Sequence, residues 1–283
     1  MRWEGVHTAL VTPFRDDDSL DLDAFRTQVR RQVAGGVQGL VVAGTTGEAP
    51  TLDDGERSLL LAIAREESAR GCTVTMGVGT NSTRSTIENI RRALLEGADA
   101  GLLVLPYYNK PNRAGMLAHV GAAAAEGLPL IVYHVPGRTG QRVAPAELAA
   151  LCEVRGVVAC KEATGDLTYG QDLMRGTTVP VLSGDDFTWL PLLSVGGTGV
   201  ISVLSNVAPA LTVAVWTAWT KGETAEARRI HASLYAVCQG LFAEVNPVPC
   251  KAALAMMGLG SARCRLPLAA GSWPPGISLD GLS

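Results

Sequence analysis

The sequence predicts an α/β fold, a (β/α)8 TIM barrel with an additional C-terminal helical layer. Eight short apolar runs recur along the 283 residues, and each is followed by a helix-like stretch. The runs are continuously apolar rather than alternating, which is typical of parallel strands covered on both faces. A doubly wound open sheet is the competing arrangement, but no G-x-G-x-x-G motif follows the first run.

The expected strands and helices alternate in order. The strand-like runs are 7–14, 39–44, 73–79, 101–107, 128–135, 156–163, 179–185 and 199–204. Between them, 22–36, 55–71 and 85–98 have the apolar spacing of amphipathic helices, and each has a glycine at or near its end, a common stop signal. Asp53 and Ser82 precede two of these stretches and are expected to cap them.

The last third of the chain predicts more helices on the same domain. We find no linker and no repeat, so we expect one domain with a helical appendage. Three further helical stretches are expected at 207–221, 223–244 and 248–258, one of which closes the barrel. The expected organisation is barrel and active site in 1–206, closing helix and appendage in 207–267, and an irregular, Pro- and Gly-rich tail in 268–283.

The composition of the chain limits which kinds of partner and metal site we expect. The formal net charge of -3 and pI near 5.8 offer no basic stripe for nucleic acid. Six cysteines without a C-x-x-C pair suggest reduced thiols, and four scattered histidines do not suggest a metal site. The sequence shows no signal peptide and no run that could span a membrane, so we expect a cytoplasmic protein.

The polar residues that could carry chemistry follow the apolar runs. In TIM barrels, reactive groups lie at the C-terminal ends of the strands. Those ends read GTTGE (44–48), PYYN (106–109), YHVPGRTG (133–140), KEATG (161–165), SGDD (183–186) and SVLSN (202–206). Together they supply one lysine, three tyrosines, two adjacent threonines and an arginine, but no metal triad, paired carboxylate set or exposed catalytic cysteine.

Lys161 is the leading candidate for a catalytic residue, because it lies at the end of an apolar run that is expected to be buried. Lys110 lies in a Pro-flanked loop, Lys221 follows a helix end and Lys251 lies one turn into a helix, which are ordinary positions. A lysine desolvated in a barrel mouth has a lowered pKa, so its neutral amine can attack a ketone and form a Schiff base. The alternative is a packed lysine whose ammonium contacts Glu162 or water, and position alone leaves both open.

Other strand-end residues suit the same chemistry. Tyr133 precedes Lys161 by one strand and could relay protons with Thr45 behind it, although a core tyrosine is the commoner role. The Thr45–Thr46 turn could hold a small carboxylate on its N–H groups, or could simply be a hydroxyl-capped turn. Arg138 suits bidentate binding of a second carboxylate, or alternatively a surface salt bridge.

Three remaining side chains are interpreted as structural. Asp185 and Asp186 resemble a metal pair, but without a third ligand nearby a helix N-cap is the better interpretation. Cys160 should point the opposite way from Lys161, toward the helices, because neighbouring side chains alternate along a strand.

Taken together, these motifs resemble the dihydrodipicolinate synthase and N-acetylneuraminate lyase family of class I pyruvate-dependent aldolases. The matching segments run in order from LVTPF through the strand-end motifs and GVISV to NPVPCK (246–251), up to about residue 267. The resemblance implies a lyase without a cofactor, in which Lys161 forms an imine with pyruvate. It also implies that Thr45, Tyr108 and Tyr133 form the proton relay. Tyr108 would reach in from a neighbouring subunit of a homotetramer built as a dimer of dimers.

The resemblance further implies how substrates are held. Thr46 would bind the pyruvate carboxylate, and the Ile201 carbonyl and Gly184 would line the pocket. Arg138 in its R-T-G context resembles the members that bind L-aspartate 4-semialdehyde; the sialic acid lyases lack it. The implied reaction condenses pyruvate with that aldehyde to give 4-hydroxytetrahydrodipicolinate, for lysine and diaminopimelate synthesis.

Three alternatives stay open. A related pyruvate aldolase could use another aldehyde, such as a 2-keto-3-deoxy sugar acid precursor. A phosphate-binding isomerase could use the Gly-rich 194–200 segment, but a carboxylate base is missing. A catalytically silent family member would act as a binding or regulatory protein, which the intact candidate set argues against.

The chain departs from the family pattern in three places. His134 stands where many members have Asn or Asp. At the lysine-inhibition site of some bacterial members, Asp54, Arg57 and Ser85 replace two histidines and a glutamate, so we expect weak or no inhibition by lysine. The tail after R-L-P-L does not read as the family's usual closing helix.

Overall fold

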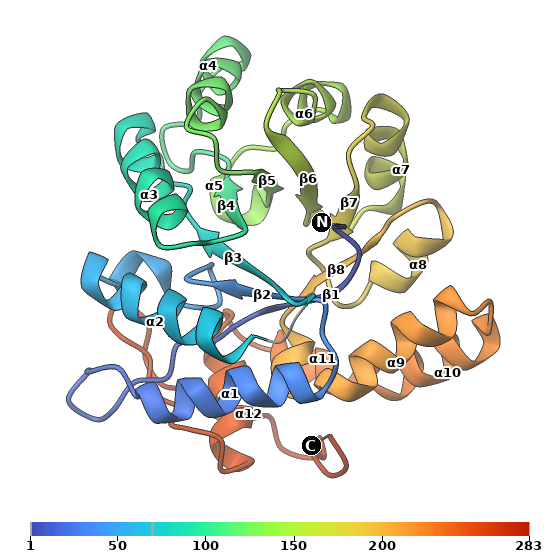
Figure 1. Ribbon diagram of the computed structural model, residues 1–283. Helices are drawn as coiled ribbons and strands as arrows, with labels where there is room; N and C mark the ends of the chain where they lie inside the picture. The colour runs from blue at the N-terminus through green and yellow to red at the C-terminus, as the bar shows by residue number, and fades with distance from the viewer. Residues whose placement is uncertain (1, 69–70, 283) are drawn as a thin grey trace. The chain divides into compact units, whose positions relative to one another are not determined.

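The strands of the computed structural model, which describes residues 2–68 and 71–282, form a closed parallel barrel in the chain order β1 to β8 (Figure 1). The expected TIM barrel is therefore confirmed. The strands are β1 (Gly5–Ala9), β2 (Gly39–Val42), β3 (Thr73–Gly77), β4 (Ala100–Val104), β5 (Leu130–His134), β6 (Val157–Glu162), β7 (Val181–Ser183) and β8 (Gly199–Ser202).

Each expected run overlaps one strand, but the strands are shorter than the runs, and β1 and β4 begin before theirs. The first run was expected at 7–14, whereas β1 covers Gly5–Ala9. Leu10 and Phe14 remain buried after the strand has ended. Pro13 cannot donate a hydrogen bond to a neighbouring strand, and Phe14 after it forms an isolated antiparallel bridge with Leu20 rather than continuing β1.

Helices follow the strands, and several begin at side-chain caps. They are α1 (Leu22–Ala34), α2 (Asp54–Glu67), α3 (Thr83–Leu95), α4 (Arg113–Ala124), α5 (Pro136–Thr139), α6 (Pro145–Cys152), α7 (Leu167–Gly176) and α8 (Trp189–Ser194). Asp53 forms a capping box with Glu56 at the start of α2, and Ser82 accepts a hydrogen bond from the Ser85 N–H in α3. Both expected caps are confirmed. Residues 69–70 of the expected helix 55–71 lie outside the described residues.

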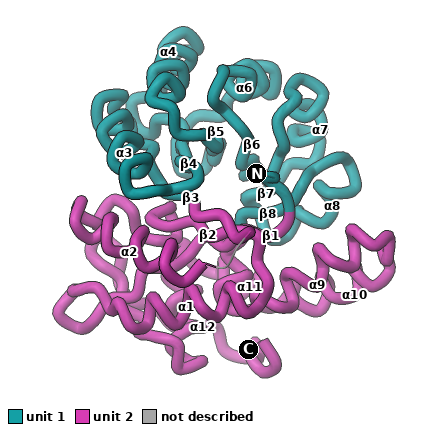
Figure 2. Tube along the Cα trace, viewed as in Figure 1, with its two compact units in different colours: residues 1–4, 75–201 teal, residues 5–74, 202–283 magenta. Residues whose placement is uncertain are grey.

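The chain divides into two compact units, coloured in Figure 2. Unit 1 consists of residues 1–4 and 75–201, and unit 2 of residues 5–74 and 202–283. In unit 1, helices α3, α4, α6, α7 and α8 lie on the outer side of the strands, with successive helices in contact (Figure 1). The strands of unit 1 are buried on both faces, which explains their continuous apolar character.

Unit 2 contains β1, β2, α1, α2 and all helices after residue 206. These later helices are α9 (Pro209–Thr220), α10 (Thr224–Ser233), α11 (Tyr235–Leu241) and α12 (Val248–Met256), with short 3-10 turns η1 (Ala49–Thr51) and η2 (Leu204–Asn206) elsewhere in the unit. The expected C-terminal helices are present. The single stretch expected at 223–244 is wrong in detail, because Leu234 ends α10 and begins α11.

The tail packs although it has no regular structure. Neither its described residues, 268–282, nor the residues 257–267 that lead into it contain a helix or strand. Trp273 and Leu282 are nevertheless buried, and the Trp273 indole N–H donates to the Ile277 carbonyl at 2.9 Å. Arg31 of α1 donates to the Leu282 carbonyl at 3.1 Å. The domain boundaries expected at residues 206 and 267 stay predictions, and residue 283 lies outside the described part.

Within the residues that the structure describes, no helix is both long and apolar enough to cross a membrane.

Candidate active site

Lys161 lies near the C-terminal end of β6, with only 6% of its surface exposed. Tyr133 of β5 and Leu182 of β7 are its partners in register. The Lys161 Nζ atom lies 4.3 Å from the centroid of the Tyr133 ring. Strand pairing therefore brings two of the expected site residues into direct contact.

Burial sets the acidity of this lysine. Desolvation lowers the pKa of Lys161 from 10.5 to about 8, the largest influence upon it. The carboxylate of Asp186, itself 1% exposed, raises this pKa, and the nearby positive charge of Arg138 lowers it further. About a tenth of Lys161 is thus free amine at pH 7, the form that a nucleophile requires.

Gly184 provides the space that the Lys161 side chain occupies. A Cβ atom at Gly184 would lie 2.8 Å from Lys161 Cε and 2.6 Å from Ala163 Cβ, closer than such atoms approach. The Gly184 N–H also donates to the Glu162 carbonyl at 2.6 Å, which holds this backbone against β6. Only glycine fits here without displacing the lysine. Ile201, the other expected pocket residue of unit 1, is buried in β8.

The neighbours of Lys161 along β6 have their own partners. Cys160 is fully buried and interacts with Cys152 of α6, which with burial raises its pKa. It is a packed thiol, as expected from the alternation of the strand. The Glu162 carboxylate accepts a hydrogen bond from the Thr164 N–H at 2.6 Å. These contacts favour the reactive-amine interpretation of Lys161 over a pair with Glu162.

The two aspartates after β7 differ. Asp185 Oδ1 accepts hydrogen bonds from the Phe187 and Thr188 N–H groups, 2.7 and 3.0 Å away, in the turn before α8. The expected helix N-cap is therefore wrong: Thr188 occupies that position of α8, without a side-chain cap. Asp186 is buried and acts electrostatically on Lys161, a role that the sequence analysis missed. The adjacent acidic residues gave no signal for this difference. In the described part of the chain, no three His, Cys, Asp or Glu side chains are grouped as metal ligands.

The expected carboxylate-binding threonines belong to unit 2, in the loop after β2. Thr46 is 3% exposed, and its Oγ1 atom accepts a hydrogen bond from Asn246 Nδ2 at 2.9 Å. Thr45 is half-buried, and its carbonyl accepts a hydrogen bond from the Glu48 N–H at 3.1 Å. The loop is therefore held by a hydrogen bond of its own backbone and by one from Asn246, in the segment before α12.

Lys251 does not have the ordinary position expected for it. Its side chain is 1% exposed, and its Nζ atom lies 2.6 Å from Glu48 Oε1 and 4.3 Å above the Phe14 ring. Glu48 is equally buried. The expectation was wrong because helical position alone does not reveal that a charge 203 residues away is its partner.

Tyr108 and Arg138 are exposed residues of unit 1. Tyr108 lies in the loop between β4 and α4, with 89% of its surface exposed and a φ of 70°. Arg138 lies in the short helix α5. Within unit 1 the structure brings Lys161 together with Tyr133 and Gly184, whereas Tyr108 stands out on the surface. The catalytic and binding roles of all these residues stay predictions.

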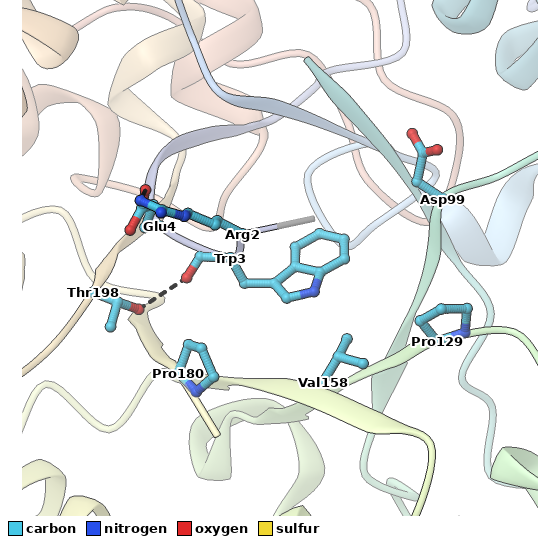
Figure 3. A pocket seen from close by; sticks show the side chains of 8 residues that line it. All are labelled: Arg2, Trp3, Glu4, Asp99, Pro129, Val158, Pro180 and Thr198. Carbon is cyan, nitrogen blue, oxygen red and sulfur yellow. Dashed lines mark hydrogen bonds and ion pairs between the residues drawn. The ribbon is translucent and has the colours of Figure 1, made fainter. Parts of the chain in front are cut away.

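A separate pocket of about 600 Å³ lies at the other ends of the strands of unit 1. Pro129 and Pro180 precede β5 and β7, and Val158 is the second residue of β6. Figure 3 shows the Trp3 indole among them, with the Trp3 carbonyl accepting a hydrogen bond from Thr198 Oγ1 at 3.1 Å. Because catalytic groups in TIM barrels lie at the opposite strand ends, this pocket is not part of the Lys161 site.

Comparisons with known proteins agree on one family. The sequence model of the dihydrodipicolinate synthetase family matches residues 2–272. A 4-hydroxy-tetrahydrodipicolinate synthase from Nitratidesulfovibrio vulgaris strain DP4 is 46% identical over 272 residues, 95% of this chain and 93% of that protein. The solved dihydrodipicolinate synthase from Thermotoga maritima is 39% identical with a TM-score of 0.93, covering 96% of this chain and 94% of the other. A solved monomeric dihydrodipicolinate synthase variant is also 39% identical, with a TM-score of 0.91 over 95% and 92% of the two chains.

Proposed function

The chain belongs to the dihydrodipicolinate synthetase family, and we propose that it condenses pyruvate with L-aspartate 4-semialdehyde to give 4-hydroxytetrahydrodipicolinate. It is then a class I pyruvate-dependent lyase of lysine and diaminopimelate biosynthesis. The observation that carries the proposal is the buried Lys161, whose pKa is about 8. No observation favours another aldehyde.

The first step is imine formation. The free amine of Lys161 attacks C2 of pyruvate, the carbonyl oxygen becomes a hydroxyl group, and that group leaves as water. With a pKa of about 8, about one Lys161 side chain in ten is uncharged at pH 7. The imine nitrogen then serves as the electron sink, so the reaction needs no added cofactor or metal.

Proton transfer is assigned to Tyr133, Thr45 and Tyr108. Dehydration of the carbinolamine needs a proton at the departing hydroxyl group, and the Tyr133 ring already packs against the Lys161 amine. Thr45 follows β2, so in a TIM barrel it stands at the catalytic end. Tyr108 would enter the relay of a neighbouring subunit, which its 89% exposure permits. This assignment requires at least one partner subunit, and the assembly we propose is a homotetramer built as a dimer of dimers.

Substrate binding is assigned to four other residues. Because Thr46 Oγ1 accepts from Asn246, its hydroxyl proton is available to the pyruvate carboxylate. Gly184 and the Ile201 carbonyl line the pocket, and Arg138 binds the carboxylate of the aldehyde substrate. Transfer of a C3 proton to the relay converts the imine to an enamine. The enamine attacks the aldehyde carbon, and the relay returns a proton to the aldehyde oxygen, which becomes the 4-hydroxyl group. The amino group of the acceptor then attacks C2, closes the ring and releases Lys161.

The proposed location is the cytoplasm, where the six free cysteines stay reduced.

Borohydride trapping tests the imine. The protein is incubated with pyruvate and borohydride, and intact and peptide masses are measured for the wild type, K161R and the matched control K221R. We expect one reduced pyruvyl adduct in the wild type and in K221R, on the peptide that carries Lys161, and none in K161R. An adduct on Lys110, Lys221 or Lys251, or no adduct at all, would contradict the proposal.

The acceptor aldehyde is tested separately, with untreated enzyme from a preparation that forms the adduct in the trapping experiment. Turnover of pyruvate is compared between L-aspartate 4-semialdehyde and aldehydes that lead to 2-keto-3-deoxy sugar acids. A preference for a sugar aldehyde would leave the imine in place and overturn the assigned product. Sedimentation of the wild type and of Y108F then tests whether a tetramer forms independently of the relay.

A further inference from the structure

A buried ion pair joins the threonine loop of unit 2, at Glu48, to Lys251 of α12. Glu48 and Lys251 side chains are each 1% exposed, and their charged atoms lie 2.6 Å apart. A second carboxylate oxygen of Glu48 accepts a hydrogen bond from the Arg265 N–H at 2.9 Å. Both oxygens of this carboxylate are therefore held, which is the condition for a buried charge to be tolerated.

The pair is joined to the loop through the backbone of Glu48. Glu48 has a φ of 54°, in the left-handed region that residues with a side chain seldom adopt. In this conformation its N–H donates to the Thr45 carbonyl, and the N–H of the next residue, Ala49, donates to the Gly44 carbonyl at 3.2 Å. A strained residue persists only where its surroundings hold it, and here the fixed carboxylate does so.

We propose that Lys251, through its ion pair with Glu48, positions the Thr45–Thr46 turn to receive the pyruvate carboxylate. Lys251 is a positioning residue, since it contacts the loop and not the substrate. The inference rests on the proposed function, in which Thr46 binds pyruvate. Asn246 and Lys251 lie five residues apart in NPVPCK, so one segment fixes both the hydroxyl group of Thr46 and the turn that carries it.

The effect of the buried pair on stability can be separated from its effect on the position of the turn. Burial lowers the pKa of Lys251, and the neighbouring Glu48 charge partly offsets that effect. Removing one member of such a pair leaves an uncompensated buried charge and is strongly destabilising, whereas removing both charges together is often neutral. A double variant that lacks both charges can thus regain stability without regaining the ion pair between Glu48 and Lys251.

The test measures how much pyruvate gives half-maximal trapping at Lys161, together with the melting temperature. The proteins are the wild type, K251M, the double variant K251M/E48Q, and R26M as a control. Arg26 pairs with Glu66 at 2.9 Å between α1 and α2, so R26M breaks an ion pair of unit 2 away from the loop. We expect half-saturation to rise about tenfold to a hundredfold in K251M, as for other small displacements of a binding group.

The double variant decides the outcome. Its melting temperature should recover toward the wild type while half-saturation stays raised, and R26M should lose stability with unchanged half-saturation. Wild-type half-saturation in a stable double variant would overturn the positioning role. If K251M does not fold, the double variant alone gives the same answer. No adduct in the wild type would overturn the proposed function, and this inference with it.

Discussion

Tyr133 and Lys161 are paired in register on β5 and β6, and the lysine Nζ atom lies 4.3 Å from the centroid of the tyrosine ring. The ring face attracts the ammonium, but burial disfavours it more strongly, and the pKa of Lys161 remains lowered to about 8. The tyrosine thus lies next to the amine without restoring its full basicity.

The rate of imine formation should depend on pH through Lys161. Because only the uncharged amine attacks pyruvate, kcat/KM for pyruvate should rise with pH and level off above about 8, the pKa of Lys161. An exposed lysine would instead give a rise that continues toward pH 10.5. Initial trapping rates between pH 6 and 10 measure this profile, and a flat profile in that interval would contradict the assigned nucleophile.

Arg138→Ala should separate binding of the two substrates. Loss of a charge-assisted, bidentate contact should raise KM for L-aspartate 4-semialdehyde about tenfold to a hundredfold, with pyruvate trapping retained. Because the Arg138 charge lowers the pKa of Lys161, the pH profile of this variant should also move to higher pH. R138K is the matched control: it should keep the pH profile but not the aldehyde affinity. Equal effects on both substrates would count against the assignment.

Gly184→Ala should damage the site through the lysine. The new Cβ atom would lie 2.8 Å from Lys161 Cε, so the side chain must move from the Tyr133 ring. A displacement of about 1 Å can cost about a hundredfold in rate, so we expect trapping to slow by that order. G121A is a suitable control, since a Cβ atom there meets nothing within 4 Å. A variant that traps pyruvate at the wild-type rate would show that the lysine tolerates the displacement.

The two buried lysines explain which features the sequence could predict. Lys161 was identifiable because its signal is local: an apolar run, then a lysine, then a polar turn at a strand end. Lys251 had no local signal, since its burial depends on Glu48, 203 residues away. The acidity of Lys161 likewise depends on Asp186, whose burial its acidic neighbour Asp185 gives no reason to expect. The order of strands and helices could be predicted from the hydrophobic pattern of the sequence. The pairing of buried charges could not, because the partners are brought together only in the folded chain.

Stability should fall in acid through His134. This last residue of β5 is fully buried and stacks on Tyr169 of α7 with ring centroids 5.6 Å apart. In the described part of the chain neither of its ring nitrogens has a hydrogen-bond partner. Burial and the nearby charge of Arg142 lower its pKa from 6.5 to about 4. The unfolded chain therefore binds the proton more readily, so this contribution is present above pH 6.5 and is lost as pH falls toward 4.

The size of that effect is about 3 kcal/mol of unfolding free energy across this interval, from the difference between the two pKa values. Urea denaturation between pH 4 and 8 measures it. In H134L the dependence should be smaller by that amount, whatever the absolute stability of the variant. An unchanged pH dependence would show that His134 is not the group that titrates.

The last prediction concerns the tail, which the sequence presented only as irregular. Trp273 packs on α11 at Gly240, where an added Cβ atom would lie 2.5 Å from the ring, so the two surfaces are in close contact. Trp273→Ala should therefore leave a cavity and lower the free energy of unfolding by about 3–5 kcal/mol. Leu266→Ala removes an apolar side chain of the same segment that is 82% exposed, and it should change stability by less than about 0.5 kcal/mol. Urea denaturation of both variants compares them, and equal stabilities would mean that the tail does not contribute to the core of unit 2.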